Sequence, residues 1–268
     1  SIKAQTYKNW ELIFWDNRST DNSVKILKSL KIKNLKYFLS KKHTSLYEAR
    51  NLAIKKTKGK YIGFIDVDDL WEKNKLKQQI KLFNDEKTIV VYGNSWLKNE
   101  KNNKKKKFIN YQVRGGYIYK DLIEKYNVGI LTSLIKKSLL KKSKVNFDNK
   151  YDIIGDFDFF IRLSKKYKFQ FIKEPVATYR IHQQNLSFLK KEKQIEEFFH
   201  WIKKNKKNLT KDEYLKIMNR IYKLEFINLR LTKSFLYSFF YFVKFIVHIF
   251  SLKNIIILFT PSYILKKL

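Results

Sequence analysis

Strand-like and helix-like segments alternate along the first part of the chain, and this alternation limits the possible folds more than any other feature. Short apolar runs, typical of buried strands, alternate with longer amphipathic runs, typical of helices. The predicted strands are Glu11–Trp15, Leu35–Leu39, Tyr61–Ile65 and Ile89–Tyr92, and Ser45–Lys56 is a predicted helix between them. Such alternation is typical of parallel βαβ units. We therefore expect an α/β fold with a mostly parallel, Rossmann-type sheet flanked by helices.

The pattern is interrupted beyond residue 97. A Lys-rich stretch, Lys101–Lys107, is typical of a solvated loop. After it, Phe157–Tyr167 predicts an amphipathic helix, and Phe169–Ile172 and Val176–Arg180 predict two further strands. From about Lys190 onward the sequence is almost wholly helical in pattern.

Three carboxylates follow the predicted strand Tyr61–Ile65, namely Asp66, Asp68 and Asp69. Packing three acids together is costly unless a cation joins them. Clustered oxygen ligands suit Mg²⁺ or Mn²⁺, and such ions usually also hold substrate phosphates. Because ligands bind at the carboxyl ends of strands in open α/β sheets, the run predicts a metal–diphosphate site. The alternative is an acidic turn that caps the following helix.

The composition favours anionic partners. Lys and Arg total 58 against 24 Asp and Glu, which gives a formal net charge of +34. Because the sequence has no zinc finger, no aromatic RNA-binding signature and no helix-turn-helix pattern, we expect no specific nucleic-acid partner. A basic nucleic-acid-binding protein stays the weaker alternative. The absence of cysteine excludes disulfides, thiolate zinc sites and a cysteine nucleophile.

The carboxyl-terminal part is dense in aromatic and aliphatic residues. Ser234–Phe250 reads SFLYSFFYFVKFIVHIF and Ile255–Phe259 reads IIILF. Charged and polar residues interrupt both runs, so no segment has the roughly 20 apolar residues of a spanning helix. We expect a helical region, 189–268, that lies on an anionic membrane, with Lys244, Lys253, Lys266 and Lys267 facing the headgroups. The alternative is a terminal helix packed on the protein core.

Four sequence blocks resemble family 2 glycosyltransferases, and they occur in the order typical of that family. The first two are QTYKNWELIFWDNRSTDNS (Gln5–Ser23) and ARNLAIKKTKGKYIGFIDVDDLW (Ala49–Trp71). The third and fourth are IIGDFDFFIRLSKKY (Ile153–Tyr167) and YRIHQQNLS (Tyr179–Ser187). The resemblance implies a GT-A fold over residues 1–188. It also implies that the sequence begins after the family's first strand and helix.

The function that this resemblance implies is inverting transfer of a sugar from a nucleotide-diphosphate sugar, with Mg²⁺ or Mn²⁺. The acceptor is expected to be a hydroxyl of a glycan or of a polyprenyl-linked molecule, in cell-surface polysaccharide synthesis. The apolar, basic tail favours a cytoplasmic protein that is peripheral at the inner membrane face. A non-catalytic remnant of such an enzyme is the alternative.

The resemblance also assigns residues to the donor site. Asp16 is expected to contact the nucleotide base, and Arg50 the phosphates. Asp68 is the expected metal ligand, Asp66 is expected to contact the ribose or the metal, and His182 the metal or the diphosphate. The alternatives are a turn-forming Asp16, a surface Arg50 paired with Glu48 and a structural His182.

On the acceptor side, the resemblance makes Asp156 the general base that takes the proton from the acceptor hydroxyl. Asp158, Asp69 and Arg180 are expected to support the site. The residue types leave other roles open, because Asp also caps helices, so Asp156 and Asp69 could each be an N-cap. For Asp156 the two roles are compatible, since a helix N-terminus favours the ionised carboxylate that a base needs.

Overall fold

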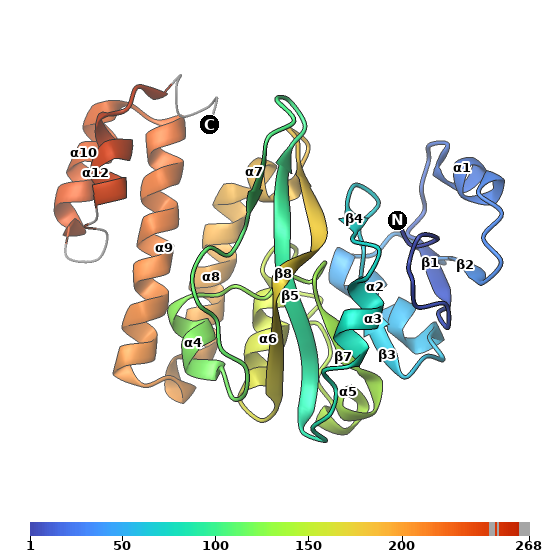
Figure 1. Ribbon diagram of the computed structural model, residues 1–268. Coiled ribbons are helices and arrows are strands. Elements are labelled where there is room, and N and C mark those ends of the chain that lie inside the picture. The colour runs from blue at the N-terminus through green and yellow to red at the C-terminus, as the bar shows by residue number, and fades with distance from the viewer. Residues whose placement is uncertain (247–249, 251, 263–268) are drawn as a thin grey trace. The chain divides into compact units, whose positions relative to one another are not determined.

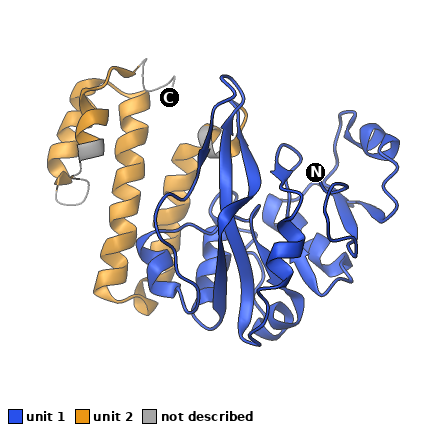
Figure 2. Cartoon of the chain, viewed as in Figure 1, with its two compact units in different colours: residues 1–183 blue, residues 184–268 orange. Residues whose placement is uncertain are grey.

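The computed structural model describes residues 1–246, 250 and 252–262 (Figure 1), and the side chains of residues 187, 188, 252 and 253 are not described. Lys266, Lys267 and the Lys253 side chain, all part of the membrane prediction, lie outside the described portion. The chain forms two compact units, residues 1–183 and 184–268 (Figure 2). Each unit is described by itself.

The first unit contains two sheets. A two-stranded sheet pairs β1 (Leu12–Asp16) with β2 (Leu35–Leu39), and a six-stranded sheet has the order β3-β7-β5-β8-β4, with β6 paired to β5. The strands of the larger sheet are β3 (Tyr61–Gly63), β4 (Leu70–Trp71), β5 (Thr88–Asn99), β6 (Lys105–Lys107), β7 (Leu134–Lys136) and β8 (Lys168–Ile181).

The α/β fold is confirmed, but the sheets are less parallel than expected. Parallel pairing occurs in β1–β2 and β5–β8, whereas the other pairs of described strands are antiparallel. A short connection can join only antiparallel neighbours, and this is the case for β5 and β6. The alternation predicted a mostly parallel sheet, but of the strands that the structure describes, only β1–β2 and β5–β8 are paired in parallel. In both pairs at least one helix lies between the two strands in the chain.

Two local predictions are wrong. The expected Lys-rich loop is a β-hairpin, in which β5 extends to Asn99 and β6 pairs back onto it. Its lysines are exposed, and lysine is common on edge strands because it prevents further pairing. The two expected strands around residues 169–180 form one strand, β8, whose register against β5 shifts next to Pro175. Proline has no N–H group to donate, so a shift in the ladder there is expected.

Six helices flank the sheets of the first unit: α1 (Ser23–Ser29), α2 (Leu46–Lys56), α3 (Lys75–Ile80), α4 (Tyr119–Glu124), α5 (Lys137–Ser143) and α6 (Gly155–Ser164). The predicted helix that is now α2 is confirmed, and its Ser45 side chain accepts a hydrogen bond from the Glu48 N–H. The core lies between β5, whose first eight residues are buried, and α6, where Phe157, Phe159 and Phe160 are buried.

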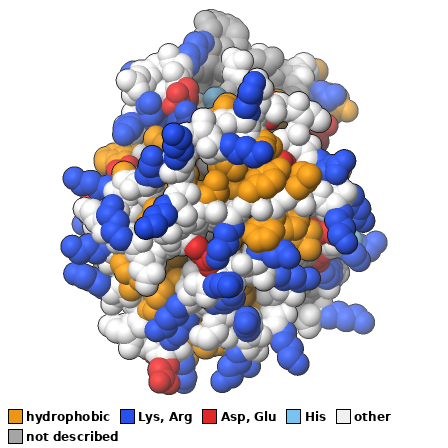
Figure 3. All heavy atoms as spheres, turned by 90° about the vertical axis from the view of Figure 1, so that its right-hand side faces the viewer, with side chains coloured by type: hydrophobic (Ala, Val, Ile, Leu, Met, Phe, Trp, Pro, Cys, Tyr) orange, Lys and Arg blue, Asp and Glu red, His pale blue; other side chains and the backbone are white. Residues whose placement is uncertain are grey.

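β1 and β3 begin at the same edge of the unit. The Glu11 carboxylate, just before β1, accepts hydrogen bonds from the N–H groups of Lys58 and Gly59, just before β3. The two strands are not paired with each other, and a cleft of about 1420 Å³ is lined by residues of both. Figure 3 views the side of the molecule where β1 and β2 lie, and apolar side chains are exposed there among many basic ones.

The second unit is helical, as predicted. It contains α7 (Leu186–Leu189), α8 (Lys191–Asn205), α9 (Lys211–Thr232), α10 (Phe235–Lys244) and α12 (Leu252–Phe259). A capping box of Thr210 and Glu213 starts α9. Phe226 of α9, Phe242 of α10 and Leu258 of α12 form a small buried cluster. Among the described residues, none of the helices is sufficiently long and apolar to cross a membrane.

Candidate functional site

The acid loop between β3 and β4, residues 64–69, is placed by antiparallel pairing of β4 with β8. Leu70 pairs with Thr178 and Trp71 with Ala177, so the loop lies beside the end of β8. Trp71 is packed against Gly63, and its indole N–H donates to the Leu131 carbonyl at 3.1 Å. This arrangement brings the acids next to the residues that follow Thr178 in the chain.

Asp66 faces the helix that precedes its strand. Arg50 of α2 donates to both carboxylate oxygens of Asp66, at 3.0 and 3.2 Å. The Arg50 side chain is only 9% exposed, whereas Asp66 is 48% exposed. The alternative in which Arg50 pairs with Glu48 is therefore not what the structure shows. Two of the predicted donor-site residues lie together.

Asp68 lies beside His182 at the end of β8. The His182 Nε2 atom is 3.0 Å from Asp68 Oδ2, and both side chains are about one third exposed, at 29% and 37% respectively. Arg180 donates through Nε to the Asp68 carbonyl. The structure thus joins the second and fourth motifs of the sequence, although they are far apart in the chain.

Asp69 is buried. Its Oδ1 atom accepts a hydrogen bond from the Arg180 N–H at 3.0 Å. Burial raises the pKa of Asp69 to about 7, with the neighbouring carboxylates of Asp68 and Asp66 adding to this effect and the Arg180 contacts opposing it. The N-cap of α3 is Asn74, so the capping role considered for Asp69 is wrong.

Asp156 occupies the first turn of α6, which begins two residues earlier than predicted. Its carboxylate accepts hydrogen bonds from the Tyr47 hydroxyl and the Tyr126 hydroxyl, each at 3.4 Å, and from the Phe157 N–H at 2.8 Å. Burial raises the pKa of Asp156, while the charge of Arg50 and the hydrogen bonds oppose the rise. The N-cap of the helix is Ile154, so Asp156 is not the cap.

Asp16 ends β1 and is 2% exposed. One carboxylate oxygen accepts from the Ser19 N–H at 2.7 Å and the other from the Tyr37 hydroxyl at 2.6 Å. Burial by itself raises the pKa of Asp16, but the hydrogen bonds from Tyr37 and Ser19 bring it below its ordinary value. The turn-forming role considered for Asp16 is therefore present, and the carboxylate is held ionised.

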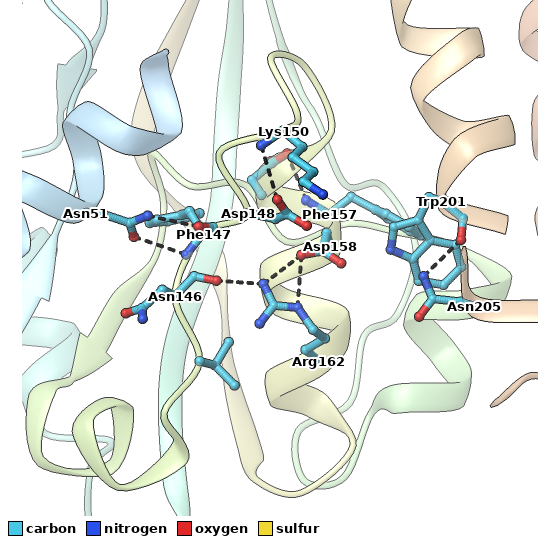
Figure 4. A network of polar contacts seen from close by, with 12 residues as sticks. Asn51, Asn146, Phe147, Asp148, Lys150, Phe157, Asp158, Arg162, Trp201 and Asn205 are labelled. Atoms are coloured by element: carbon cyan, nitrogen blue, oxygen red, sulfur yellow. Dashed lines mark hydrogen bonds and ion pairs between the residues drawn. The ribbon is translucent and has the colours of Figure 1, made fainter. Parts of the chain in front are cut away.

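Asp158 follows Asp156 by two residues, which places the two side chains on different faces of α6. Asp158 takes part in a polar network (Figure 4). Arg162 donates to Asp158 Oδ2 at 2.6 and 2.9 Å and to the Asn146 carbonyl at 2.6 Å. Asn51 of α2 binds both the N–H and the carbonyl of Phe147. These contacts tie the segment before α6 to α2 and α6, and so position the helix that carries Asp156.

The predicted metal ligands are not all together. In the described part of the chain, no three His, Asp or Glu side chains lie close enough to hold a metal ion as a group. Asp66 is turned toward Arg50, which leaves the Asp68–His182 pair. One carboxylate, an imidazole and the oxygens of a diphosphate are a suitable ligand set for Mn²⁺ or Mg²⁺, since such ions commonly take one or two protein carboxylates plus substrate phosphates. The donor chemistry of this pair therefore fits the ion.

Two tyrosines near the site were missed in the sequence. Tyr47 is buried three residues before Arg50 on α2, and the Arg50 guanidinium lies 5.4 Å from the centre of its ring. That spacing places both side chains on one helix face, so the sequence carried a signal for Tyr47. Tyr126 follows α4, and its approach to Asp156 depends on packing of α4 against α6, for which no local signal exists.

Comparison with known proteins agrees with the four motifs. The family model for glycosyl transferase family 2 matches residues 1–145. The UDP-Glc:alpha-D-GlcNAc-diphosphoundecaprenol beta-1,3-glucosyltransferase WfgD of Escherichia coli is 32% identical over 152 residues, which cover 57% of this chain and 58% of that protein. The amylovoran biosynthesis glycosyltransferase AmsB of Erwinia amylovora is 28% identical over 67% of this chain and 63% of its own. The chain thus spans less than two thirds of either relative.

Solved structures show the same fold. S. aureus TarS in complex with UDP-GlcNAc matches with a TM-score of 0.58 at 16% identity, over 87% of this chain and 70% of that one. The mannosyltransferase PcManGT from Pyrobaculum calidifontis, in complex with GDP-Man and Mn²⁺, matches with a TM-score of 0.56 at 15% identity, over 96% and 72% of the two chains. With the family model matching more than half of the residues, the chain belongs to glycosyl transferase family 2 and has the GT-A fold.

Proposed function

We propose that this chain is an inverting glycosyltransferase that moves a sugar from a nucleotide-diphosphate sugar to a hydroxyl of a glycan or lipid-linked acceptor. One observation carries the proposal. Asp66, Arg50, Tyr47 and Asp156 contact one another in series, so the acid loop and the carboxylate of α6 belong to one connected set of side chains. These contacts link the proposed site of the diphosphate leaving group, at Arg50 and the acid loop, to the proposed base, Asp156.

Asp156 is the proposed general base. Its carboxylate takes the proton of the acceptor hydroxyl while that oxygen attacks the anomeric carbon, and the bond from this carbon to the diphosphate oxygen breaks. Direct displacement by a single nucleophile inverts the anomeric configuration. Burial raises the pKa of Asp156, which makes it a stronger base than an ordinary aspartate, and the charge of Arg50 opposes this rise. Tyr47 and Tyr126 orient the carboxylate through their hydroxyl groups.

Asp68 and His182 are the proposed ligands of a divalent ion, with Asp66 close by. When bound, the ion supplies positive charge at the diphosphate leaving group. Arg50, whose charge is buried beside the acid loop, is the proposed phosphate contact, and Asp16 the base contact. Asn17, Arg50 and Asp66 all line the cleft of about 1420 Å³, which supports a nucleotide site along its edge.

The named relatives support the donor and acceptor classes. WfgD is named for a UDP-Glc donor and a diphosphoundecaprenol acceptor, and AmsB for synthesis of amylovoran. The TarS and PcManGT structures hold UDP-GlcNAc and GDP-Man, the latter with Mn²⁺. We therefore extend the proposal to cell-surface polysaccharide synthesis with a nucleotide-sugar donor and Mg²⁺ or Mn²⁺.

We further propose that the second unit holds the protein on an anionic membrane, at the cytoplasmic face where lipid-linked acceptors are elongated. One side of α10 packs on α9 through Phe242. This side therefore behaves as expected from the alternative in which the terminal helix packs on the protein core. The other side exposes large apolar side chains, among them Leu236 at 60%, Tyr237 at 67% and Phe240 at 62%. Exposed aromatics next to Lys244 are typical of an interfacial helix.

Calorimetry with UDP and GDP, in Mn²⁺ and in chelator, tests the donor site, and transfer to synthetic lipid-diphosphate sugars tests the reaction. We expect metal-dependent nucleotide binding and product of inverted anomeric configuration. Metal-independent binding would contradict the role of the Asp68–His182 pair. Nucleotide binding with neither transfer nor donor hydrolysis would favour the non-catalytic alternative.

A further inference from the structure

The β5–β6 hairpin is directly connected to the candidate site. The carboxyl-terminal part of β5 pairs in parallel with the part of β8 that leads to His182, and β6 pairs with β5 on its other side. Glu100, just after β5, donates its N–H to the Ile181 carbonyl at 3.1 Å. The hairpin is therefore a continuation of the sheet edge that carries Arg180 and His182.

The register aligns three cations across these strands. Lys98 pairs with Arg180 of β8 on one side and with Lys105 of β6 on the other. Directly paired residues place their side chains on the same face of a sheet. Arg180, Lys98 and Lys105 thus form a row across one face, which we call the cationic row. It starts at the residue that donates to the Asp68 carbonyl and ends at the exposed β6 edge.

The two lysines of this row are only partly neutralised. Glu100 lies 3.5 Å from the Lys98 Nζ atom in a partly exposed pair. No ion pair to Lys105 occurs among the residues that the structure describes. Like charges directly opposite each other destabilise a sheet. A dianionic ligand placed over the row would remove that repulsion and would gain charge-assisted hydrogen bonds.

We propose that the cationic row binds the diphosphate group of a lipid-diphosphate-linked acceptor. This inference rests on the proposed function and specifies the acceptor of that site. The row adjoins the Asp68–His182 pair, and neighbouring strands are about 4.8 Å apart, so it extends over roughly the length of one or two sugar units. An acceptor sugar whose hydroxyl reaches the donor beside the Asp68–His182 pair would have its own diphosphate over Lys98 and Lys105. Lys106 offers a matched control, because it lies on the same strand with its side chain on the opposite face.

Calorimetry with geranyl diphosphate, in chelator and at low salt, tests the inference on the full chain. Geraniol reports any contribution of the apolar group. We expect the diphosphate to bind and geraniol not to bind measurably. The Lys98→Gln, Lys105→Gln double variant should lose about tenfold in affinity, equivalent to about 1.4 kcal/mol, and Lys106→Gln less than about twofold.

Equal losses of affinity for geranyl diphosphate in the double variant and in Lys106→Gln would overturn the inference. The absence of geranyl diphosphate binding by the wild type would also overturn it. A parallel titration with UDP and Mn²⁺ separates this result from the proposed function, since that nucleotide site does not include Lys98 or Lys105. Normal UDP binding without geranyl diphosphate binding would reject the cationic row alone. Thermal unfolding of each variant confirms that the fold is retained.

Discussion

The ring of Tyr47 lies so close to Gly155 that a Cβ atom on this glycine would come within 2.5 Å of two ring carbons. Gly155 is the first residue of α6, and Asp156 follows it. The absence of a side chain therefore allows α2 and α6 to approach until the Tyr47 hydroxyl reaches the Asp156 carboxylate. The ring also packs against the tilted ring of Phe147, which is tied to Asn51 of the same helix.

Gly155→Ala should displace the Tyr47 ring and with it the hydrogen bond to Asp156. We expect a loss of stability of about 1–3 kcal/mol from overpacking and a fall in turnover of about tenfold, because the proposed base Asp156 is no longer oriented. Gly129→Ala is the control, since its added Cβ would meet only the Thr132 hydroxyl at an ordinary 3.5 Å. Denaturant unfolding and transfer assays provide the two measurements. Unchanged turnover in Gly155→Ala would contradict a positioning role for Tyr47.

Asp156→Asn preserves the size of the side chain and removes its basicity. We expect turnover to fall about 100-fold or more, while donor affinity measured by calorimetry changes little. In the wild type, turnover should decline as the pH falls through the pKa of Asp156, which burial places above that of an ordinary aspartate. This acid limb should be absent from the residual activity of the variant. Equal loss of donor affinity and stability would instead indicate a structural residue.

Asp68→Asn should weaken the effect of Mn²⁺ on nucleotide binding by about tenfold, because an amide is a poorer ligand for a hard cation than a carboxylate. Asp69→Asn should weaken it less, since Asp69 is buried and accepts from the Arg180 N–H, whereas Asp68 is the acid beside His182. Titrations of UDP at several Mn²⁺ concentrations distinguish the two variants. A larger effect of Asp69→Asn would reverse the assignment of the ligand.

Lys75 should make the stability depend on pH above neutrality. It is fully buried against Gln79 and the Trp71 ring, and burial lowers its pKa to about 7. The unfolded chain keeps this proton up to the ordinary lysine pKa, so between these values it binds more protons than the folded chain. The free energy of unfolding should therefore rise with pH above 7, by up to about 1.4 kcal/mol per pH unit.

Urea unfolding of the wild type and of Lys75→Met at pH 7, 8 and 9 measures this effect. The wild type should gain stability relative to the variant as the pH rises. Lys77→Met, on the exposed side of the same helix, should give a difference from the wild type that does not change with pH. A constant difference for Lys75→Met as well would mean that Lys75 stays protonated in the folded protein.

Charges placed on the exposed side of α10 should release the protein from membranes. Leu236→Glu with Phe240→Glu converts two side chains that are 60% and 62% exposed, so the cost to folding is small. We expect flotation with anionic liposomes to fall strongly, because both buried apolar area and charge attraction are lost. Ile26→Glu alters a residue of α1 that is 59% exposed and should have no effect. Equal flotation of both variants would exclude α10 as the membrane contact.

Local patterns in the sequence determined much of the fold and the candidate residues. The strand Leu35–Leu39 and the helix that became α2 were predicted with correct bounds or nearly so, since their residue periodicity and the Ser45 cap act within a few residues. The family was indicated by the resemblance of four sequence blocks and by their order, which also needs no knowledge of tertiary contacts. The hairpin of residues 98–107 was missed because a run of lysines reports solvent exposure, and an edge strand can be as exposed as a loop.

Only the tertiary structure decided which of the predicted site residues lie together. Asp68 meets His182 although 114 residues separate them, and this contact depends on the pairing of β4 with β8. The same pairing buries Asp69, although it is the same residue type as Asp68 and directly follows it in the sequence. The orientation of Asp156 depends in turn on how closely α2 packs against α6. Contacts of this kind arise from long-range packing, and a chain's local residue pattern carries no information on which distant partner each side chain will meet.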